Sequence, residues 1–295
     1  MTLHRATLPL RRTARRALLG ALFVVAPCST VAAQPLAERA APVGASHRPS
    51  APDPSDARAK DRSLVAPASY DYTTLGLRRA DGIKLGGMAL AAFAVSSADR
   101  RGDAWARHPG VQDDRTLDAL SKVGDVTGST VGVGIGPVLW LLGRVRHDSG
   151  TAVMGLRTTE SVVVGSVAVT AIKLIAGRTR PYASFDNSPT HWKLFGGTSD
   201  STKSFASGHT TVAAAAAVTL AAEWRRQGRR GWKTVAPPLA YALATLTAAS
   251  RVRDRAHWMS DVVSGGALGM VSALVVRRWH DAHPNNWIDR HFLAR

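Results

Sequence analysis

Cysteine is almost absent from this chain, because its 295 residues include only Cys28. If the N-terminal segment is removed after Ala33, the remaining protein has no thiol. That excludes disulfides, a cysteine nucleophile and thiolate metal sites. Pro27, directly before Cys28, argues against lipid attachment at this cysteine. The chemistry of the folded part must therefore come from other side chains.

Acidic and aromatic residues are also scarce. The chain has 21 Asp and Glu against 38 Lys and Arg, a formal net charge of +17, and 6% aromatic residues. Such a charge suits nucleic acid, anionic membranes or phosphorylated ligands. The basic residues are spread along the chain and form no recognition-helix signature, so we expect no nucleic-acid partner. A phosphorylated small molecule or lipid, with association to a membrane, remains.

The N-terminus has the features of an export signal. Five arginines without an acidic residue precede an apolar run over 17–26, and small residues end at Ala33. This pattern predicts a signal peptide over 1–33, with a retained membrane anchor as the alternative. Its removal would leave a net charge of 17 − 5 = +12. We expect export to the cell envelope or periplasm.

Residues 34–70 are rich in Pro and Ala and predict a disordered linker, so the folded domain is expected over 71–295. Within it lie six apolar stretches without period-2 alternation, which favours helices. The stretches cover 84–98, 126–143, 160–176, 209–224, 235–250 and 258–276. Gly177 and Pro181 are expected to end the third helix, and Arg277-Arg278 the sixth.

Long hydrophobic runs are missing as well. The charge-free run over 126–143 is shorter than the roughly 20 residues of a membrane span, and the loops show no Lys/Arg asymmetry. We expect an exported bundle that is soluble or membrane-associated, while integral insertion stays open.

Three short stretches in the second half of the chain contain the residues for chemistry on a phosphoryl group. In the third stretch, His257 and Asp261 lie four residues apart at a helix start and share a face. Asp261 can accept a hydrogen bond from one ring nitrogen of His257, which leaves the other nitrogen as a nucleophile. The alternative for this pair alone is a helix-start aspartate beside a surface histidine.

In the second stretch, Ser207, Gly208 and His209 precede an apolar helix, whose free N–H groups suit an anion. Ser207 adds a hydroxyl donor, Gly208 permits close approach, and His209 can protonate a leaving alkoxide as a general acid. An N-cap serine followed by an incidental histidine is the alternative.

Cations complete the set. Lys173, Arg180 and Arg251 can bind phosphoryl oxygens, and each arginine can grip two of them. Arg178, Arg253 and Arg255 lie nearby in the sequence, and we interpret them as solvated charges at the rim.

Together these groups predict attack by His257 on phosphorus, protonation of the leaving group by His209, and release of phosphate by water. No aspartate cluster or His/Glu spacing suits a metal, so we expect neither a metal nor a cofactor. His280 and His283 are interpreted as part of a solvated C-terminal tail.

The ordered motifs resemble the type 2 phosphatidic acid phosphatase and vanadium haloperoxidase superfamily. Its pattern is Lys-x6-Arg-Pro, Pro-Ser-Gly-His and Ser-Arg-x5-His-x3-Asp, and ten of eleven fixed positions agree between residues 173 and 261. The departure is Ala206, where the family has proline. Alanine keeps the donors of this turn but loosens their placement.

The resemblance implies an all-α helical bundle of about six core helices, of the acid phosphatase or vanadium-dependent haloperoxidase type. It also implies metal-independent hydrolysis of a phosphate ester. The implied roles are nucleophile for His257, acid for His209, orienting residue for Asp261, and phosphate ligands for Lys173, Arg180, Ser207, Gly208 and Arg251.

Two other functions stay open. A vanadate-dependent haloperoxidase would hold vanadate in the same pocket as a cofactor, whereas a phosphatase would bind it as an inhibitor. Haloperoxidases of the family tend to be considerably larger, which disfavours that reading. A catalytically idle phosphate- or lipid-binding protein is suggested by Ala206 and the basic charge. We expect the aromatic residues between Tyr182 and Ser204 to pack this loop down rather than to face a lipid tail.

Overall fold

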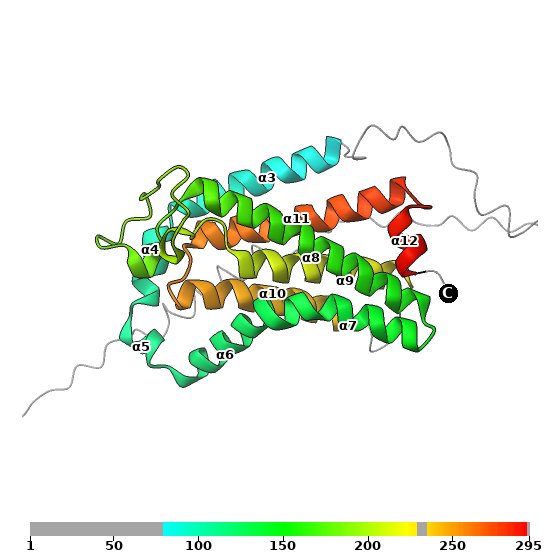
Figure 1. Ribbon diagram of the computed structural model, residues 1–295. Coiled ribbons are helices and arrows are strands. Elements are labelled where there is room, and N and C mark those ends of the chain that lie inside the picture. Colours follow the sequence, from blue (N-terminus) through cyan, green and yellow to red (C-terminus); the bar gives the residue numbers. More distant parts are fainter. Residues whose placement is uncertain (1–78, 229–234, 294–295) are drawn as a thin grey trace, which may run out of the picture. The chain divides into compact units, whose positions relative to one another are not determined.

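A computed structural model of the protein describes residues 79–228 and 235–293 (Figure 1). Over these residues the regular structure is helical, with one isolated bridge between Arg178 and Trp192. The all-α prediction is therefore confirmed. The predicted signal peptide over 1–33 and the predicted linker over 34–70 lie outside the described residues.

Each of the six predicted stretches corresponds to a long helical segment. One helix end was also predicted, because α8 ends before Gly177. Pro237 and Pro238 lie in the first turn of α10, where a missing backbone N–H costs least. The α-helices are α3 Arg79–Ser96, α4 Asp99–Ala106, α5 Pro109–Gln112, α6 Arg115–Val126, α7 Gly132–Val145, α8 Ser149–Ala176, α9 Gly208–Arg226, α10 Ala236–Arg253, α11 Met259–Ala282 and α12 Trp287–Phe292. A π-helical turn, η1 (Thr127–Val131), joins α6 to α7, and the 3-10 turns η2 (Pro181–Ala183) and η3 (Asp200–Thr202) lie in the loop after α8.

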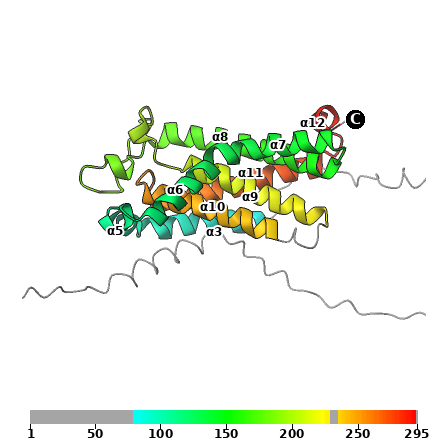
Figure 2. The same cartoon turned by 90° about the horizontal axis from the view of Figure 1, so that it is seen from below.

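Helix α9 lies at the centre of the bundle, where it packs against α8, α10 and α11 (Figures 1 and 2). Its run of small residues over 213–217 is buried. A Cβ added at Gly269 of α11 would lie 2.4 Å from the Thr211 carbonyl oxygen of α9. Close approach of these two helices holds their N-termini together, and both N-termini belong to the candidate site.

Two of the helices are longer than the sequence predicted. α11 continues past Arg277-Arg278 to Ala282, and α8 begins at Ser149, where Asp148 caps it. The start of α8 was missed because Arg157 and Glu160 interrupt the apolar pattern. Both charges lie inside the bundle rather than in solvent.

A cluster of buried polar residues at the end of the bundle next to α12 explains those charges. Arg157 forms two hydrogen bonds with the Asp289 carboxylate, at 2.6 and 2.7 Å. His280 Nε2 lies 2.7 Å from Glu160 Oε2, and His280 is only 7% exposed. The interpretation of His280 as part of a solvated tail is therefore wrong. The cluster attaches α12 to α8 and α11.

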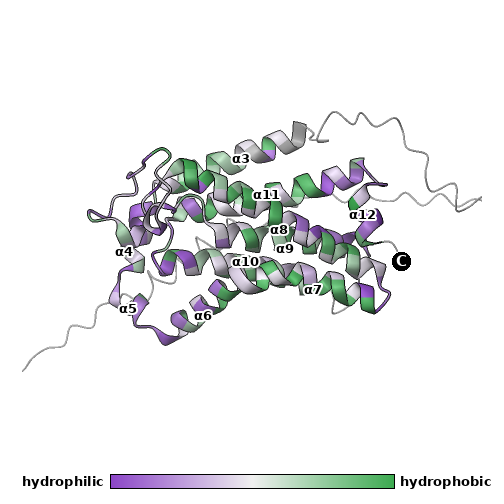
Figure 3. Ribbon diagram, viewed as in Figure 1, coloured by the Kyte–Doolittle hydropathy of each residue, from purple (hydrophilic) through white to green (hydrophobic). Residues whose placement is uncertain are grey.

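Three helical segments are long and apolar enough to cross a membrane: 115–145, 149–176 and 259–282. Hydrophobic residues cover much of α3, α7 and α8 in Figure 3. Many are exposed, among them Val138 and Leu141 on α7 and Val163 and Val167 on α8. The charge-free runs underestimated the lengths of the apolar helices, because the helices continue through charged residues. These surfaces are compatible with membrane association.

Candidate active site

The three predicted stretches meet at one end of the bundle. The end of α8 and the loop over 177–207 supply the first, the N-terminus of α9 the second, and the junction of α10 with α11 the third (Figure 1). The Ser207 N–H donates to the Asp261 carbonyl at 3.0 Å, which joins the second stretch to the third. The first stretch lies against the second, since a Cβ added at Gly208 would be 3.7 Å from Lys173 Cε.

His257 is buried, and a backbone carbonyl fixes its ring. Its Nδ1 lies 2.6 Å from the Ser204 carbonyl oxygen and 3.7 Å from Asp261 Oδ2. The predicted pairing with Asp261 is therefore close but not direct. Since a carbonyl only accepts, Nδ1 carries the hydrogen and Nε2 keeps its lone pair. Burial lowers the pKa of His257 to about 4, against the opposing effect of Asp261, so the ring is neutral at pH 7.

Asp261 is surrounded by donors. Its Oδ2 accepts from the Ser204 hydroxyl at 2.5 Å and from the Trp258 N–H at 2.9 Å. Its Oδ1 accepts from Arg178 Nη1 at 2.5 Å. Asp261 thus orients the loop that holds His257, besides lying near the ring itself.

The three arginines interpreted as solvated rim charges are instead structural, and that interpretation is wrong. Arg178 is 3% exposed and forms a second ion pair with Asp99 at 2.7 Å. Arg255 Nε pairs with Asp103 at 2.8 Å. Arg253 is buried and donates to the Gln112 carbonyl at 3.1 Å. Their carboxylate and carbonyl partners in α4 and α5 lie far away in the sequence, which is why the local pattern did not reveal them.

The second stretch starts α9, as both the anion-site prediction and its N-cap alternative expected, and its role in anion binding stays a prediction. Ser207 is the N-cap, and its Oγ accepts from the Thr210 backbone N–H at 3.5 Å and from the Thr210 hydroxyl at 2.9 Å. A Cβ at Gly208 would be in ordinary van der Waals contact with Lys173 Cε, at 3.7 Å. Ala206, where the related pattern has proline, is buried, and the Phe205–Ala206 peptide bond is cis.

The three predicted cations are paired with oxygens of the protein. Lys173 Nζ donates to the Lys203 carbonyl at 2.7 Å. Arg180 binds Asp200 through Nε to the carbonyl and through Nη2 to the carboxylate, both at 2.9 Å. Arg251 lies between Asp125 and Asp254, with 2.8 Å to each. A phosphoryl group would exchange with these oxygens or add to them.

His209, the predicted acid, lies beside a carboxylate that the sequence did not indicate. Its Nε2 is 3.3 Å from Asp125 Oδ1, the same oxygen that Arg251 binds. Burial, reinforced by Arg251 and opposed by Asp125, lowers the pKa of His209. Asp125 comes from α6, just before η1, whose Gly128 packs against His209 so tightly that an added Cβ would lie 2.8 Å from His209 Cβ. A π-turn next to a functional side chain is a recurrent arrangement.

Residues 155–284 match the family described as the PAP2 superfamily. This part of the chain belongs to the PAP2 superfamily. All eight predicted site residues lie inside the matched range, and the recognition made from the motifs is confirmed. Searches of curated proteins and of solved structures found no match to the chain. Membership indicates a phosphatase or phosphoesterase that acts on phosphorylated substrates or lipids.

Two aspartates near the candidate site lie outside the matched range: Asp125 on α6 contacts His209 and Arg251, and Asp99 on α4 contacts Arg178 and Ser260. Sequence reasoning missed both, because they are single aspartates in polar segments. It also missed Ser204, which binds both His257 and Asp261. Among the described residues, no group of three or more His, Cys, Asp or Glu side chains could hold a metal ion. The metal-free reaction stays a prediction.

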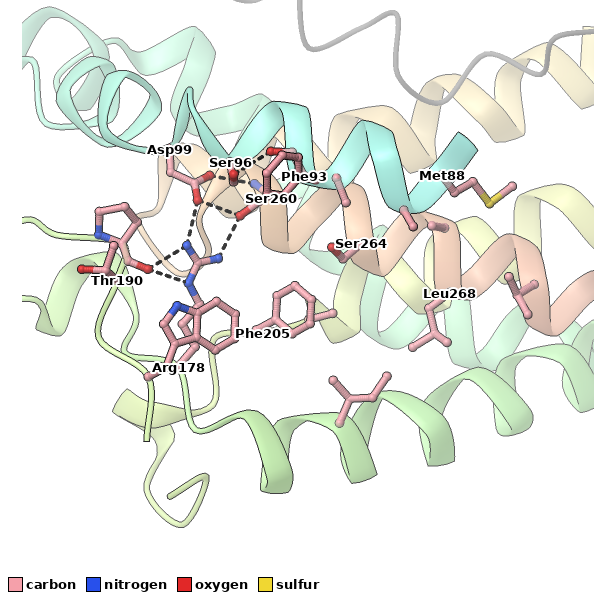
Figure 4. A pocket seen from close by; sticks show the side chains of 18 residues that line it. Met88, Phe93, Ser96, Asp99, Arg178, Thr190, Phe205, Ser260, Ser264 and Leu268 are labelled. Carbon is pink, nitrogen blue, oxygen red and sulfur yellow. Dashed lines mark hydrogen bonds and ion pairs between the residues drawn. The ribbon is translucent and has the colours of Figure 1, made fainter. Parts of the chain in front are cut away.

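A cavity of about 670 Å³ lies on the other side of Arg178 (Figure 4). Its walls are apolar side chains of α3 and α11 with Ile172 of α8, and Asp99, Arg178 and Ser260 form its polar end. Phe205 and Ala206 line this cavity and directly precede Ser207 in the sequence. The ion pairs of Arg178 thus have an apolar surrounding on that side.

The loop over 182–204 corrects one more expectation. Trp192 packs on the Arg178 guanidinium, 4.7 Å from its carbon to the ring centroid. Phe185 and Phe195 are 88% and 71% exposed, so the expected packing is wrong for them. Phe185 stacks on His191 at the surface, with 5.0 Å between the ring centroids.

Proposed function

We propose that the protein is a metal-independent phosphatase that hydrolyses a phosphate monoester or a lipid phosphate or pyrophosphate through a phosphohistidine. The observation that supports it most is the fixed tautomer of His257. The Ser204 carbonyl holds Nδ1–H, and the low pKa keeps Nε2 unprotonated at neutral pH.

In the first step Nε2 of His257 forms a bond to phosphorus as the ester P–O bond breaks. The leaving oxygen takes a proton from His209. The ligands of the phosphoryl oxygens are the side chains of Lys173, Arg180, Ser207 and Arg251 and the N–H groups at the start of α9. The bound dianion favours protonated His209, because it opposes the lowering of that pKa by Arg251. In the second step water attacks phosphorus, His209 takes its proton, and phosphate leaves.

Exposed apolar side chains support a lipid phosphate as the substrate. Phe185, Leu194 and Phe195 project from the loop beside the site, and α3, α7 and α8 expose further apolar residues. Apolar patches of this kind are typical of membrane contact. The protein would then act at a membrane surface, in the cell envelope after export.

A phosphate-release assay on the full chain tests the proposal. We expect release from a generic phosphate ester, phosphatidic acid or a prenyl pyrophosphate in the presence of a chelator, with inhibition by vanadate. His257→Gln should lower kcat by about a thousandfold or more, because the nucleophile is lost. An acid-labile phosphohistidine should be trapped in the wild-type protein.

The matched control is His291→Gln, since His291 is an exposed histidine on α12. It should retain wild-type activity. Full activity in His257→Gln would contradict the mechanism. Phosphate binding without turnover would indicate an idle binding protein, and halide oxidation with vanadate and peroxide a haloperoxidase.

A further inference from the structure

Arg178 uses every N–H of its guanidinium in the interior of the protein. Nε and Nη2 donate to the Pro189 carbonyl at 3.1 and 2.9 Å, and Nη2 also donates to Asp99 at 2.7 Å. Nη1 donates to the Ser260 hydroxyl at 2.8 Å and to Asp261 at 2.5 Å. Figure 4 shows the guanidinium between Asp99 and Ser260 at the end of the apolar cavity.

Asp99 ties this arginine to the start of α11. Its Oδ1 accepts from the Ser260 N–H at 2.8 Å, one of the N–H groups at the helix N-terminus that has no partner within the helix. Its Oδ2 accepts from the Ser260 hydroxyl at 2.7 Å and from Arg178. The Asp99 carboxylate is buried, and Asp99 is the first residue of α4.

We propose that Asp99 and Arg178 are positioning residues of the phosphatase site. Together with Asp261 they form a buried carboxylate–guanidinium–carboxylate chain that holds the Asp261 carboxylate and the Ser204 segment in register with the ring of His257. This inference rests on the proposed function and assigns a role to a residue outside the family match.

The burial of the chain gives it rigidity. The ring centroids of Trp192 and Trp258 lie 4.7 and 5.5 Å from the guanidinium carbon of Arg178. The cavity beside the guanidinium is lined mainly by apolar side chains. Arg178, Asp99 and Asp261 are 3%, 1% and 0% exposed, so loss of one partner would leave a buried charge uncompensated, and each carboxylate must stay in contact with the arginine. Movement of Asp261 would break its ion pair with Arg178. Movement of Ser204 would break the hydrogen bond from its hydroxyl to Asp261 and the one between its carbonyl and His257.

The chain should also set the electrostatics of the nucleophile. Three charged groups change the pKa of His257: Asp261 from α11, Lys173 from α8 and Arg180 from the loop after α8. His257 in turn lowers the pKa of Asp200 in η3. Arg178 partly neutralises Asp261, a carboxylate 3.7 Å from the His257 ring that favours its protonated form. Its removal should make protonation of the ring easier, and removal of the Asp99 charge should make it harder.

The test compares Arg178→Gln, Asp99→Asn and Ser260→Ala in the full chain. For the first two we expect kcat per folded molecule to fall by about a hundredfold, because a displaced catalytic group loses its alignment. The inhibition constant of inorganic phosphate should change little, since no phosphate ligand is altered. The acidic limb of the kcat/KM profile, expected near pH 4 in the wild type, should move up by about one unit in Arg178→Gln and down in Asp99→Asn.

Arg157→Lys is the matched control. Arg157 is another buried arginine with a two-fold hydrogen bond to a carboxylate, at the end of the bundle next to α12. It should lose thermal stability while the kcat of the folded fraction and the acidic limb stay unchanged. If a charge variant does not fold, Ser260→Ala decides, because it removes one hydroxyl and should lower kcat by about tenfold.

Histidine resonances followed by NMR against pH separate this inference from the proposed function. The signal absent from His257→Gln identifies His257, and its pKa should move in opposite directions in the two charge variants even if no substrate is turned over. An unchanged His257 pKa, or a kcat within about twofold of the wild type in all three variants, would overturn the positioning role.

Discussion

Asp200 is a residue whose effect on the candidate site can be measured separately from catalysis. It is exposed, with 74% of its side chain accessible, yet it binds Arg180 and accepts the Tyr182 hydroxyl at 2.8 Å. The hydroxyl and the Arg180 guanidinium hold the pKa of Asp200 below its ordinary value. The carboxylate is therefore charged at neutral pH and competes with a phosphoryl group for Arg180.

Asp200→Asn should lower the KM for a phosphate ester by about two- to fivefold and leave kcat unchanged, because an exposed ion pair of this kind is worth less than about 1 kcal/mol. Steady-state kinetics and inhibition by phosphate measure the change. Asp281→Asn removes a comparable exposed partner, bound to Arg226 at 2.9 Å, and should have no effect. A rise in KM would instead mean that Asp200 holds Arg180 in place for the substrate.

The sequence predicted three stretches that the structure brings to one end of the bundle, because their residue types and spacing form a recognisable pattern. It did not indicate the residues that hold them. The sequence around Arg178 resembles that around a solvated arginine. Only folding brings its partners Asp99 of α4 and Asp261 of α11 to it. Ser204 acts partly through its backbone carbonyl, and the sequence contains no signal for such a role.

At the scale of elements, the end of α8 determines the path of the loop that holds Arg178 and Arg180. Gly177 has φ 56°, and an added Cβ would lie 1.9 Å from the Lys193 carbonyl oxygen. Glycine was predicted to end this helix; its left-handed conformation favours glycine, and the clash of a Cβ with the Lys193 carbonyl excludes larger residues. Helix lengths were less predictable, because Arg157 is buried and Glu160 is half-buried in α8 through partners in α11 and α12.

Gly177→Ala should lower the free energy of unfolding by at least about 1–2 kcal/mol, the cost of a left-handed conformation in a residue with a Cβ. It should also lower kcat, since both arginines follow the turn directly. Thermal unfolding and kinetics measure the two effects. Gly134→Ala is the control, because Gly134 lies in α7 with nothing within 4 Å of its added Cβ. A Gly177→Ala protein as stable and active as the control would contradict the role of this turn.

At the scale of the molecule, the bundle combines a basic chain with apolar outer faces. Either feature could bind the protein to an anionic membrane, and they differ in salt dependence. Electrostatic attraction is largely screened at about 1 M salt, whereas burial of apolar surface is not. The three long apolar segments favour the second mode.

We expect the full chain to sediment with membranes, to stay there after a wash with about 1 M salt, and to be released by detergent. Sedimentation followed by immunoblotting checks this, with a soluble protein of the same compartment as the control. Release by salt alone would show that the net charge of +17, and not the apolar faces, holds the protein at the membrane.

Asp99 and Asp125 reach the site from helices that precede the matched range. The motif residues and the aspartates that contact their surroundings therefore lie in different parts of the sequence and can vary independently. Under the proposed mechanism, substitutions in α4 or α6 should change the reactivity of His257 or His209 while all three signature motifs stay intact. Chains with identical motifs can thus differ in rate and pH optimum. Exchanging the segment that contains α4 to α6 between such chains is a direct way to transfer those properties.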